Sequence, residues 1–89
     1  GFWGDAAIAD LKLVRLLARG LTICAAAPLP DDCIALGREV TEAYQAAFTR
    51  GASNRERGSV TEHLDFLIVM IDARAPLQGT LQALRSTLA

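Results

Sequence analysis

The chain has 89 residues, of which 52 % are hydrophobic and 21 % are charged, and its formal net charge is −1 at pH 7. These values describe one small globular domain and exclude a disordered tail, because the apolar content suffices to build a core. Nine Lys and Arg stand against ten Asp and Glu, so there is no basic excess and we do not expect nucleic acid as a partner.

Alanine and leucine dominate the apolar residues. Sixteen Ala and thirteen Leu stand against four Val and five Ile, which favours helix over sheet. Segments rich in Pro, Gly, Ser and Asn divide the chain near residues 28–32, 51–58 and 75–76. We therefore expect a single all-α domain, a small four-helix bundle with helices at about 5–26, 31–50, 59–74 and 76–88.

Local signals indicate where these helices begin and end. Asp5 can cap the first helix, and Gly51 suits the left-handed position at the end of the second. We expect the third helix to begin at Ser59, because Glu62 follows three residues later as in a capping box. Pro76 either ends the third helix or occupies the first turn of the fourth, since proline interrupts a continuous helix.

The second and fourth helices each carry a single apolar face. On the second, the face consists of Cys33, Leu36, Val40, Ala43, Tyr44, Ala47 and Phe48. On the fourth, it is a narrow stripe of Leu77, Leu81, Leu84 and Leu88 at coiled-coil spacing. Each of these helices therefore needs only one neighbouring surface.

The first and third helices are apolar around most of their circumference. Their polar strips are thin, comprising Lys12, Arg15 and Arg19 on the first helix and Thr61, Asp65 and Asp72 on the third. So small a monomer has few other helices to cover them. We therefore expect a partner chain to complete the bundle through Leu13, Leu17, Leu21, Phe66, Ile68, Val69 and Met70. The opposite charges of the two strips suggest that Arg15 and Arg19 pair with Asp65 and Asp72, within one chain or across an interface.

These patterns predict a non-catalytic domain for protein–protein interaction or oligomerisation. We expect it to form a homodimer or to bind another helical protein. Whether two copies would pair in parallel or antiparallel stays open. The alternative is a compact monomer in which the chain covers its own central helix.

A second function is indicated by the arginines of the segment 50–59. Arg50, Arg55 and Arg57 precede the expected helix N-terminus at Ser59. Guanidinium groups beside exposed backbone N–H groups can bind a phosphate. The alternative is therefore a module that binds an anion or a nucleic-acid backbone.

The other reactive side chains form no recognised motif, so we expect neither an enzyme nor a cofactor or metal site. His63 lacks the nucleophile or further ligands that catalysis or metal binding would need. A helical hairpin could bring Cys24 and Cys33 within bridging range, but two reduced thiols are the default. With so few cysteines we favour an intracellular location.

The segment 12–30 superficially resembles a signal peptide. Arg15 and Arg19 interrupt what would have to be an uncharged apolar run, so we reject this interpretation and a membrane span with it. The chain begins at Gly1 and stops at Ala89 within a helical pattern. We therefore expect a piece excised from a longer protein, or a processed chain.

Overall fold

The computed structural model of the chain describes residues 1–22, 28–72 and 75–89. The described residues form four helices and no strand, namely α1 (Phe2–Gly20), α2 (Asp31–Gly51), α3 (Asn54–Met70) and α4 (Pro76–Leu88). The predicted all-α, four-helix architecture is therefore confirmed.

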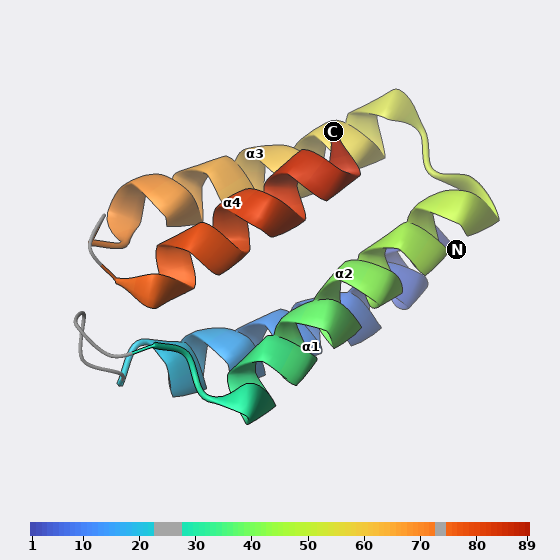
Figure 1. Cartoon of the computed structure of the whole chain (residues 1–89). Coiled ribbons are helices and arrows are strands. Elements are labelled where there is room, and N and C mark those ends of the chain that lie inside the picture. Colours follow the sequence, from blue (N-terminus) through green and yellow to red (C-terminus); the bar gives the residue numbers. More distant parts are fainter. Residues whose placement is uncertain (23–27, 73–74) are drawn as a thin grey trace.

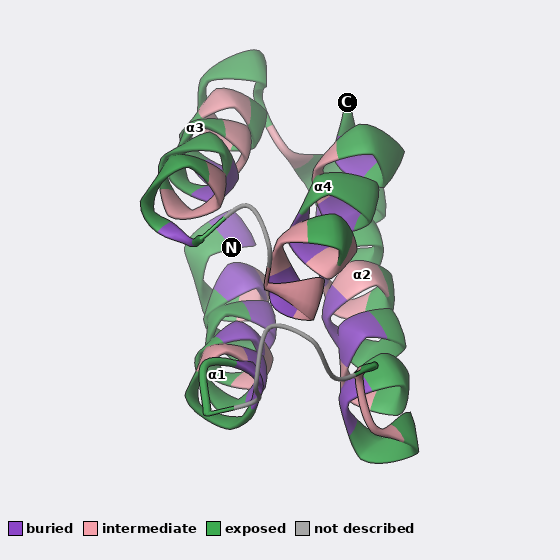
Figure 2. Ribbon diagram, turned by 60° about the vertical axis from the view of Figure 1, so that its left-hand side comes forward, coloured by how far each residue is buried: buried purple, intermediate pink, exposed green. Residues whose placement is uncertain are grey.

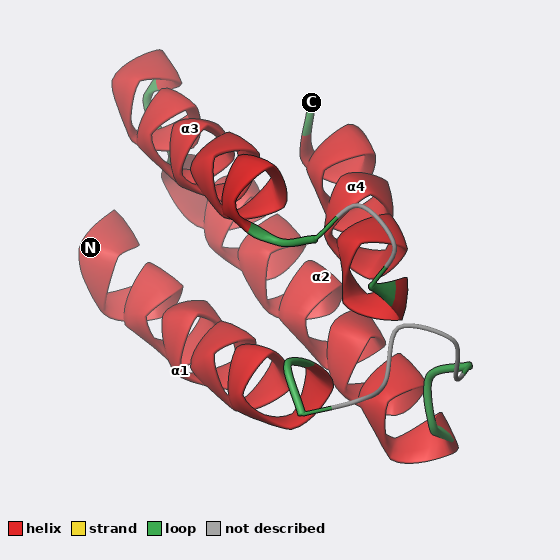
Figure 3. Ribbon diagram, turned by 90° about the vertical axis from the view of Figure 1, so that its left-hand side faces the viewer, coloured by secondary structure: helices red, strands yellow, loops and turns green. Residues whose placement is uncertain are grey.

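The helices form two antiparallel hairpins that lie against each other (Figure 1). α1 packs along α2, α4 packs on α2 and also reaches α1, and α3 packs mainly on α4. Viewed nearly along the helices, α1 and α3 form one side of the molecule and α2 and α4 the other (Figure 2). α1 and α3 run in the same direction, so their C-terminal ends lie at the same end of the bundle (Figure 3).

The core lies between the two hairpins and is built from one face of each helix. On α1 the buried residues recur every three or four positions and are Phe2, Ala6, Ala9, Leu13, Leu16 and Gly20. The predicted leucine stripe of α4 is buried throughout. At Gly20, α1 and α4 approach so closely that a Cβ added to the glycine would lie 2.9 Å from Leu77 Cδ1. The glycine therefore makes room for a leucine of α4.

Ion pairs recur at every seventh residue along the edge of α1 that faces α2. The pairs are Asp5–Arg50 at 2.9 Å, Lys12–Glu39 at 3.3 Å and Arg19–Asp32 at 3.0 Å. Exposed pairs of this kind contribute about 0–1 kcal/mol each. Their main effect is to fix the antiparallel register of the α1–α2 hairpin.

The predicted ion pairs between the polar strips of α1 and α3 are wrong for two of the four residues. Arg19 pairs with Asp32 of α2, and Asp65 pairs with Arg85 of α4 at 2.8 Å. The reason is topological, because Arg19 and Asp65 each lie beside the other helix of their own hairpin.

A partly buried hydrogen bond also joins α1 to α2. The Tyr44 side chain is 1 % exposed, and its hydroxyl donates to Oδ1 of Asp10. Burial, and then the neighbouring Asp10 carboxylate, raise the pKa of Tyr44 above the ordinary value of 10.0, because both disfavour the phenolate.

This shift predicts a loss of stability at alkaline pH. Since the pKa of Tyr44 is higher in the folded state, the stabilisation is complete below about pH 10 and falls as the pH rises beyond it. Denaturant unfolding at a series of alkaline pH values measures the decline. Tyr44 is the only tyrosine, so its phenolate absorbance reports the titration directly. The Tyr44→Phe variant should show a smaller decline, and an equal decline in both proteins would refute this assignment.

The start of α3 differs from the prediction. The helix begins at Asn54, because Ser53 and Glu56 form a complete capping box six residues earlier than expected. Ser53 Oγ accepts from the Glu56 N–H at 3.1 Å, and Glu56 Oε1 accepts from the Ser53 N–H at 2.9 Å. Ser59 therefore lies inside the helix, and the segment 50–59 is not a loop.

The end of α3 is also earlier than predicted. The helix ends at Met70, and Ile71 is extended. The side-chain amide of Gln78 on α4 donates to the carbonyls of Ile68 at 3.1 Å and Ile71 at 3.3 Å. Gln78 thus satisfies backbone acceptors that the end of the helix leaves without helical donors. Part of the predicted end, residues 73–74, lies outside the described residues.

Both ends of α1 differ from the prediction, whereas the ends of α2 and α4 agree with it to within one residue. α1 starts at Phe2, with Asp5 in its first turn, so the prediction that Asp5 caps this helix is wrong. The predicted extension of the first helix to residue 26 is also wrong, because α1 ends at Gly20 and Leu21 and Thr22 form a turn. Residues 23–26 lie outside the described ranges. Gly51 has the positive φ expected of it, +128°, and Pro76 occupies the first turn of α4.

The capping box gives a direct test of where α3 begins. Ser53→Ala should lower the free energy of unfolding by about 1 kcal/mol, because it removes the acceptor for the Glu56 N–H. Ser59→Ala is the matched control and should change stability little, since alanine is favourable inside a helix. Denaturant titration compares the two. A larger loss for Ser59→Ala would show that the helix begins at the later serine.

Candidate interaction surface

The outer face of α1 is an apolar stripe that the rest of the chain leaves uncovered. Its central residues alternate spacings of three and four positions and are all exposed: Gly4, Ala7, Leu11, Val14, Ala18 and Leu21. Trp3 and Ile8 lie beside them and are exposed too. We call these eight residues the outer stripe. It lies opposite the buried face of α1, so the helix has two apolar faces and only one of them meets the core.

The outer stripe is large for the surface of a small protein. Its five large side chains are between 54 % and 60 % exposed: Trp3, Ile8, Leu11, Val14 and Leu21. They present on the order of 500 Å² of apolar surface, which matches the largest patch on a typical monomer, a patch that is often functional. The stripe is therefore a candidate site for contact with another molecule.

Trp3 is held in place at the N-terminal end of the outer stripe. The Phe2 and Trp3 rings meet edge to face, with their centroids 4.9 Å apart. Phe2 is buried against Phe48 of α2, at a centroid distance of 6.0 Å. The exposed indole thus rests on a ring anchored in the core, which suits it to act as a rigid contact residue.

A second apolar patch lies at the C-terminal end of α3. Phe66, Val69 and Met70 are 59 %, 82 % and 67 % exposed, and we call them the α3 cluster. Their spacings of three and four residues place them on one face of the helix. The α3 cluster lies at the same end of the bundle as Leu21 of the outer stripe.

The structure divides the seven interface residues predicted from the sequence. Leu21 and the three residues of the α3 cluster are exposed. Leu17 and Ile68 are half-buried against the core. Leu13 is 2 % exposed and belongs to the core, so its place in the predicted interface is wrong. Leu13 lies on the arc of α1 that faces the other helices, and the predicted set lacked Leu11 and Val14 on the opposite arc.

The predicted anion site is not assembled. Arg50 pairs with Asp5, and Arg57 lies over the Phe48 ring, 5.2 Å from its centroid. Arg57 also donates to the carbonyl of Ala52 at 3.4 Å. At the N-terminus of α3 the Glu56 carboxylate already occupies the capping position. Arg55 is exposed, and Ser59 lies within the helix. A helix end that carries a carboxylate does not favour a phosphate.

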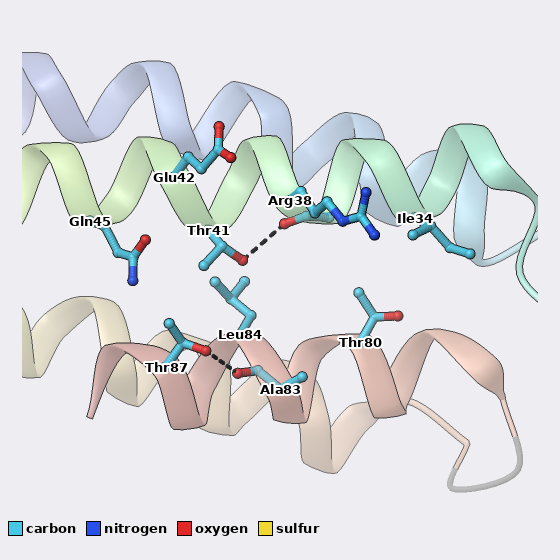
Figure 4. A pocket seen from close by; sticks show the side chains of 10 residues that line it. Ile34, Arg38, Thr41, Glu42, Gln45, Thr80, Ala83, Leu84 and Thr87 are labelled. Atoms are coloured by element: carbon cyan, nitrogen blue, oxygen red, sulfur yellow. Dashed lines mark hydrogen bonds between the residues drawn. The ribbon is translucent and has the colours of Figure 1, made fainter.

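A groove of about 410 Å³ runs between α2 and α4 (Figure 4). Gly37 forms part of its floor, where an added Cβ would lie 3.1 Å from Thr80 Cγ2. Thr41 and Thr87 line it, but their hydroxyls donate to carbonyls of their own helices. The groove is open, and the hydroxyls of Thr41 and Thr87 are already hydrogen-bonded.

The remaining candidate residues do not come together. His63 is exposed on α3. Within the described ranges, no group of three or more His, Cys, Asp and Glu residues could hold a metal ion. The Cys33 thiol is buried and free, and Cys24 lies outside the described residues. In the part of the chain that the structure describes, no helix is long and apolar enough to cross a membrane.

The fold and this surface define a small all-α bundle with one helix that is apolar on two faces. In comparisons with known proteins, the chain matches no protein-family model, no curated protein and no solved structure. The physical properties of the surface therefore indicate what this chain does.

Proposed function

We propose that this chain is a non-catalytic oligomerisation domain that forms a homodimer through the outer stripe of α1. The α3 cluster would extend the contact at one end. The observation that carries the proposal is the exposure of Trp3, Ile8, Leu11, Val14 and Leu21 along a single face of one helix. Burial of such apolar surface is the main driving force of association.

The size of the surface supports a second copy as the partner. A standard interface buries about 800 Å² on each side. The outer stripe supplies most of this area, and its polar neighbours and the α3 cluster can supply the rest. The net charge of −1 means that two copies repel each other only weakly. A helix of 19 residues is about 28 Å long, so a second α1 matches the outer stripe in length.

Light scattering over a concentration series tests this proposal. The weight-average mass should rise from 9.5 kDa towards twice that value as the protein concentration increases through the micromolar range. A constant mass of one chain at high micromolar concentration would refute the homodimer. A mass that rises only when a different protein is added would indicate a heterologous partner and would equally overturn the proposal.

A further inference from the structure

We infer that the two α1 helices of the homodimer lie parallel and in register, with Asp10 of each copy paired to Arg15 of the other. This inference rests on the homodimer proposed above. It follows from the positions that flank the outer stripe, because flanking charges set the orientation of paired helices.

The spacing of the outer stripe is that of a coiled-coil seam. In heptad positions a to g, Gly4, Leu11 and Ala18 occupy a, and Ala7, Val14 and Leu21 occupy d. These are the two positions that face the partner helix in a two-stranded coiled coil. The seam covers the exposed length of α1, and its opposite side is the buried face of the helix.

The two edges of the seam are complementary only between parallel helices. One edge, at position g, carries Trp3, Asp10 and Leu17, and the other, at position e, carries Ile8, Arg15 and Thr22. In a parallel pair, each g residue lies beside the e residue five positions later in the other chain. Asp10 then faces Arg15 of the second copy, and Trp3 faces Ile8 of the second copy. The two-fold symmetry forms each contact twice.

An antiparallel pair would lose both contacts. It places g beside g and e beside e. Asp10 could then meet only Trp3, Leu17 or a second Asp10. Arg15 could meet only Ile8, Thr22 or a second Arg15. In every such register Asp10 lies beside an apolar side chain or a second carboxylate. Arg15 lies beside an apolar side chain, an uncharged threonine or a second arginine.

The two charged residues are available for this contact. The other charged residues of α1, Asp5, Lys12 and Arg19, pair with α2 along a different edge. Among the described residues, Arg15 forms no ion pair. The Tyr44 hydroxyl binds one oxygen of Asp10, which holds the carboxylate beside the seam and leaves its second oxygen for Arg15.

Cysteine cross-linking tests the orientation. Ala7 and Ala18 lie near opposite ends of the outer stripe and are exposed, so Ala7→Cys and Ala18→Cys should not disturb the fold. In a parallel dimer each variant should form a disulfide with its own copy, because equivalent seam residues lie within bridging range. The parent protein under the same oxidation is the control for its native thiols. Mass spectrometry of the digested product identifies the linked residues.

Charge reversal supplies an independent test. Arg15→Asp should weaken the dimer about tenfold, because it places two carboxylates together twice. Asp10→Arg added to Arg15→Asp should recover most of this loss. Arg38→Asp, an exposed arginine on α2, should leave the dissociation constant unchanged.

The outcomes separate the orientation from the dimer itself. Parallel pairing predicts self-linked cysteines and a loss of affinity on Arg15→Asp. Cross-links only in a mixture of Ala7→Cys and Ala18→Cys, with no effect of Arg15→Asp, would show antiparallel helices and overturn this inference while the homodimer stands. A parent protein that stays monomeric in the light-scattering series would overturn both.

Discussion

Val14→Glu is expected to convert the homodimer into a monomer, raising the dissociation constant by more than about 100-fold. Val14 is 58 % exposed in the single chain and lies at the centre of the outer stripe. Two-fold symmetry would place two carboxylates in the driest part of the interface, and an unpaired charge is costly to bury there. Sedimentation velocity over a concentration series measures the change.

Ile34→Glu is the matched control for this variant. Ile34 is another β-branched side chain that is partly exposed, at 43 %, but it lies on α2. The same change of charge and shape there should leave the dissociation constant unchanged. Equal weakening by both variants would point to a general effect of charge, and an unaffected Val14→Glu dimer would exclude the outer stripe as its interface.

Leu77→Ala should cost about 3 kcal/mol of folding stability, since truncation of a fully buried leucine typically costs 2–5 kcal/mol. Leu77 is 0 % exposed and packs against Gly20, where α4 contacts α1. The loss is a large fraction of the total stability of so small a domain. Denaturant unfolding measures this loss in the free energy of unfolding. Parent and variant are compared at the same protein concentration, because dimerisation stabilises the folded state.

Gly20→Ala, made both in the parent and in the Leu77→Ala variant, tests whether Gly20 and Leu77 are in contact. In the parent, the new methyl group would press on Leu77 Cδ1. This offsets the gain of about 0.4–1 kcal/mol that alanine brings at a glycine of negative φ by restricting the unfolded chain. Once Leu77 is shortened, the methyl group has room and the gain should appear in full. An identical effect of Gly20→Ala in both backgrounds would show that the two residues do not touch.

The overall fold could be predicted because two of its four helices, α2 and α4, have unambiguous ends and faces. Pro76 and the leucines that follow it define α4 by themselves, and Gly51 marks the end of α2. The start of α3 was missed because Ser53–Glu56 and Ser59–Glu62 both have the capping-box spacing. Local sequence does not distinguish two such boxes, and only the formed helix shows that the first is used.

The candidate surface was only partly predictable for a different reason. α1 is apolar on two arcs, and hydrophobicity alone does not say which arc faces the core. Leu13 and Leu11 are the same residue type, yet the first is buried and the second exposed. The charged residues Lys12 and Arg19 carry the missing information, because their pairs to α2 mark the edge where the hairpin closes.

The central claim is that a second copy of this chain covers the outer stripe of α1. An isotope-filtered nuclear Overhauser experiment on a mixture of labelled and unlabelled protein observes contacts between copies directly. We expect cross-peaks between the methyl groups of Leu11 and Val14 of one chain and those of the other. Contacts between copies that involve only α2 and α4, with none from α1, would contradict the account.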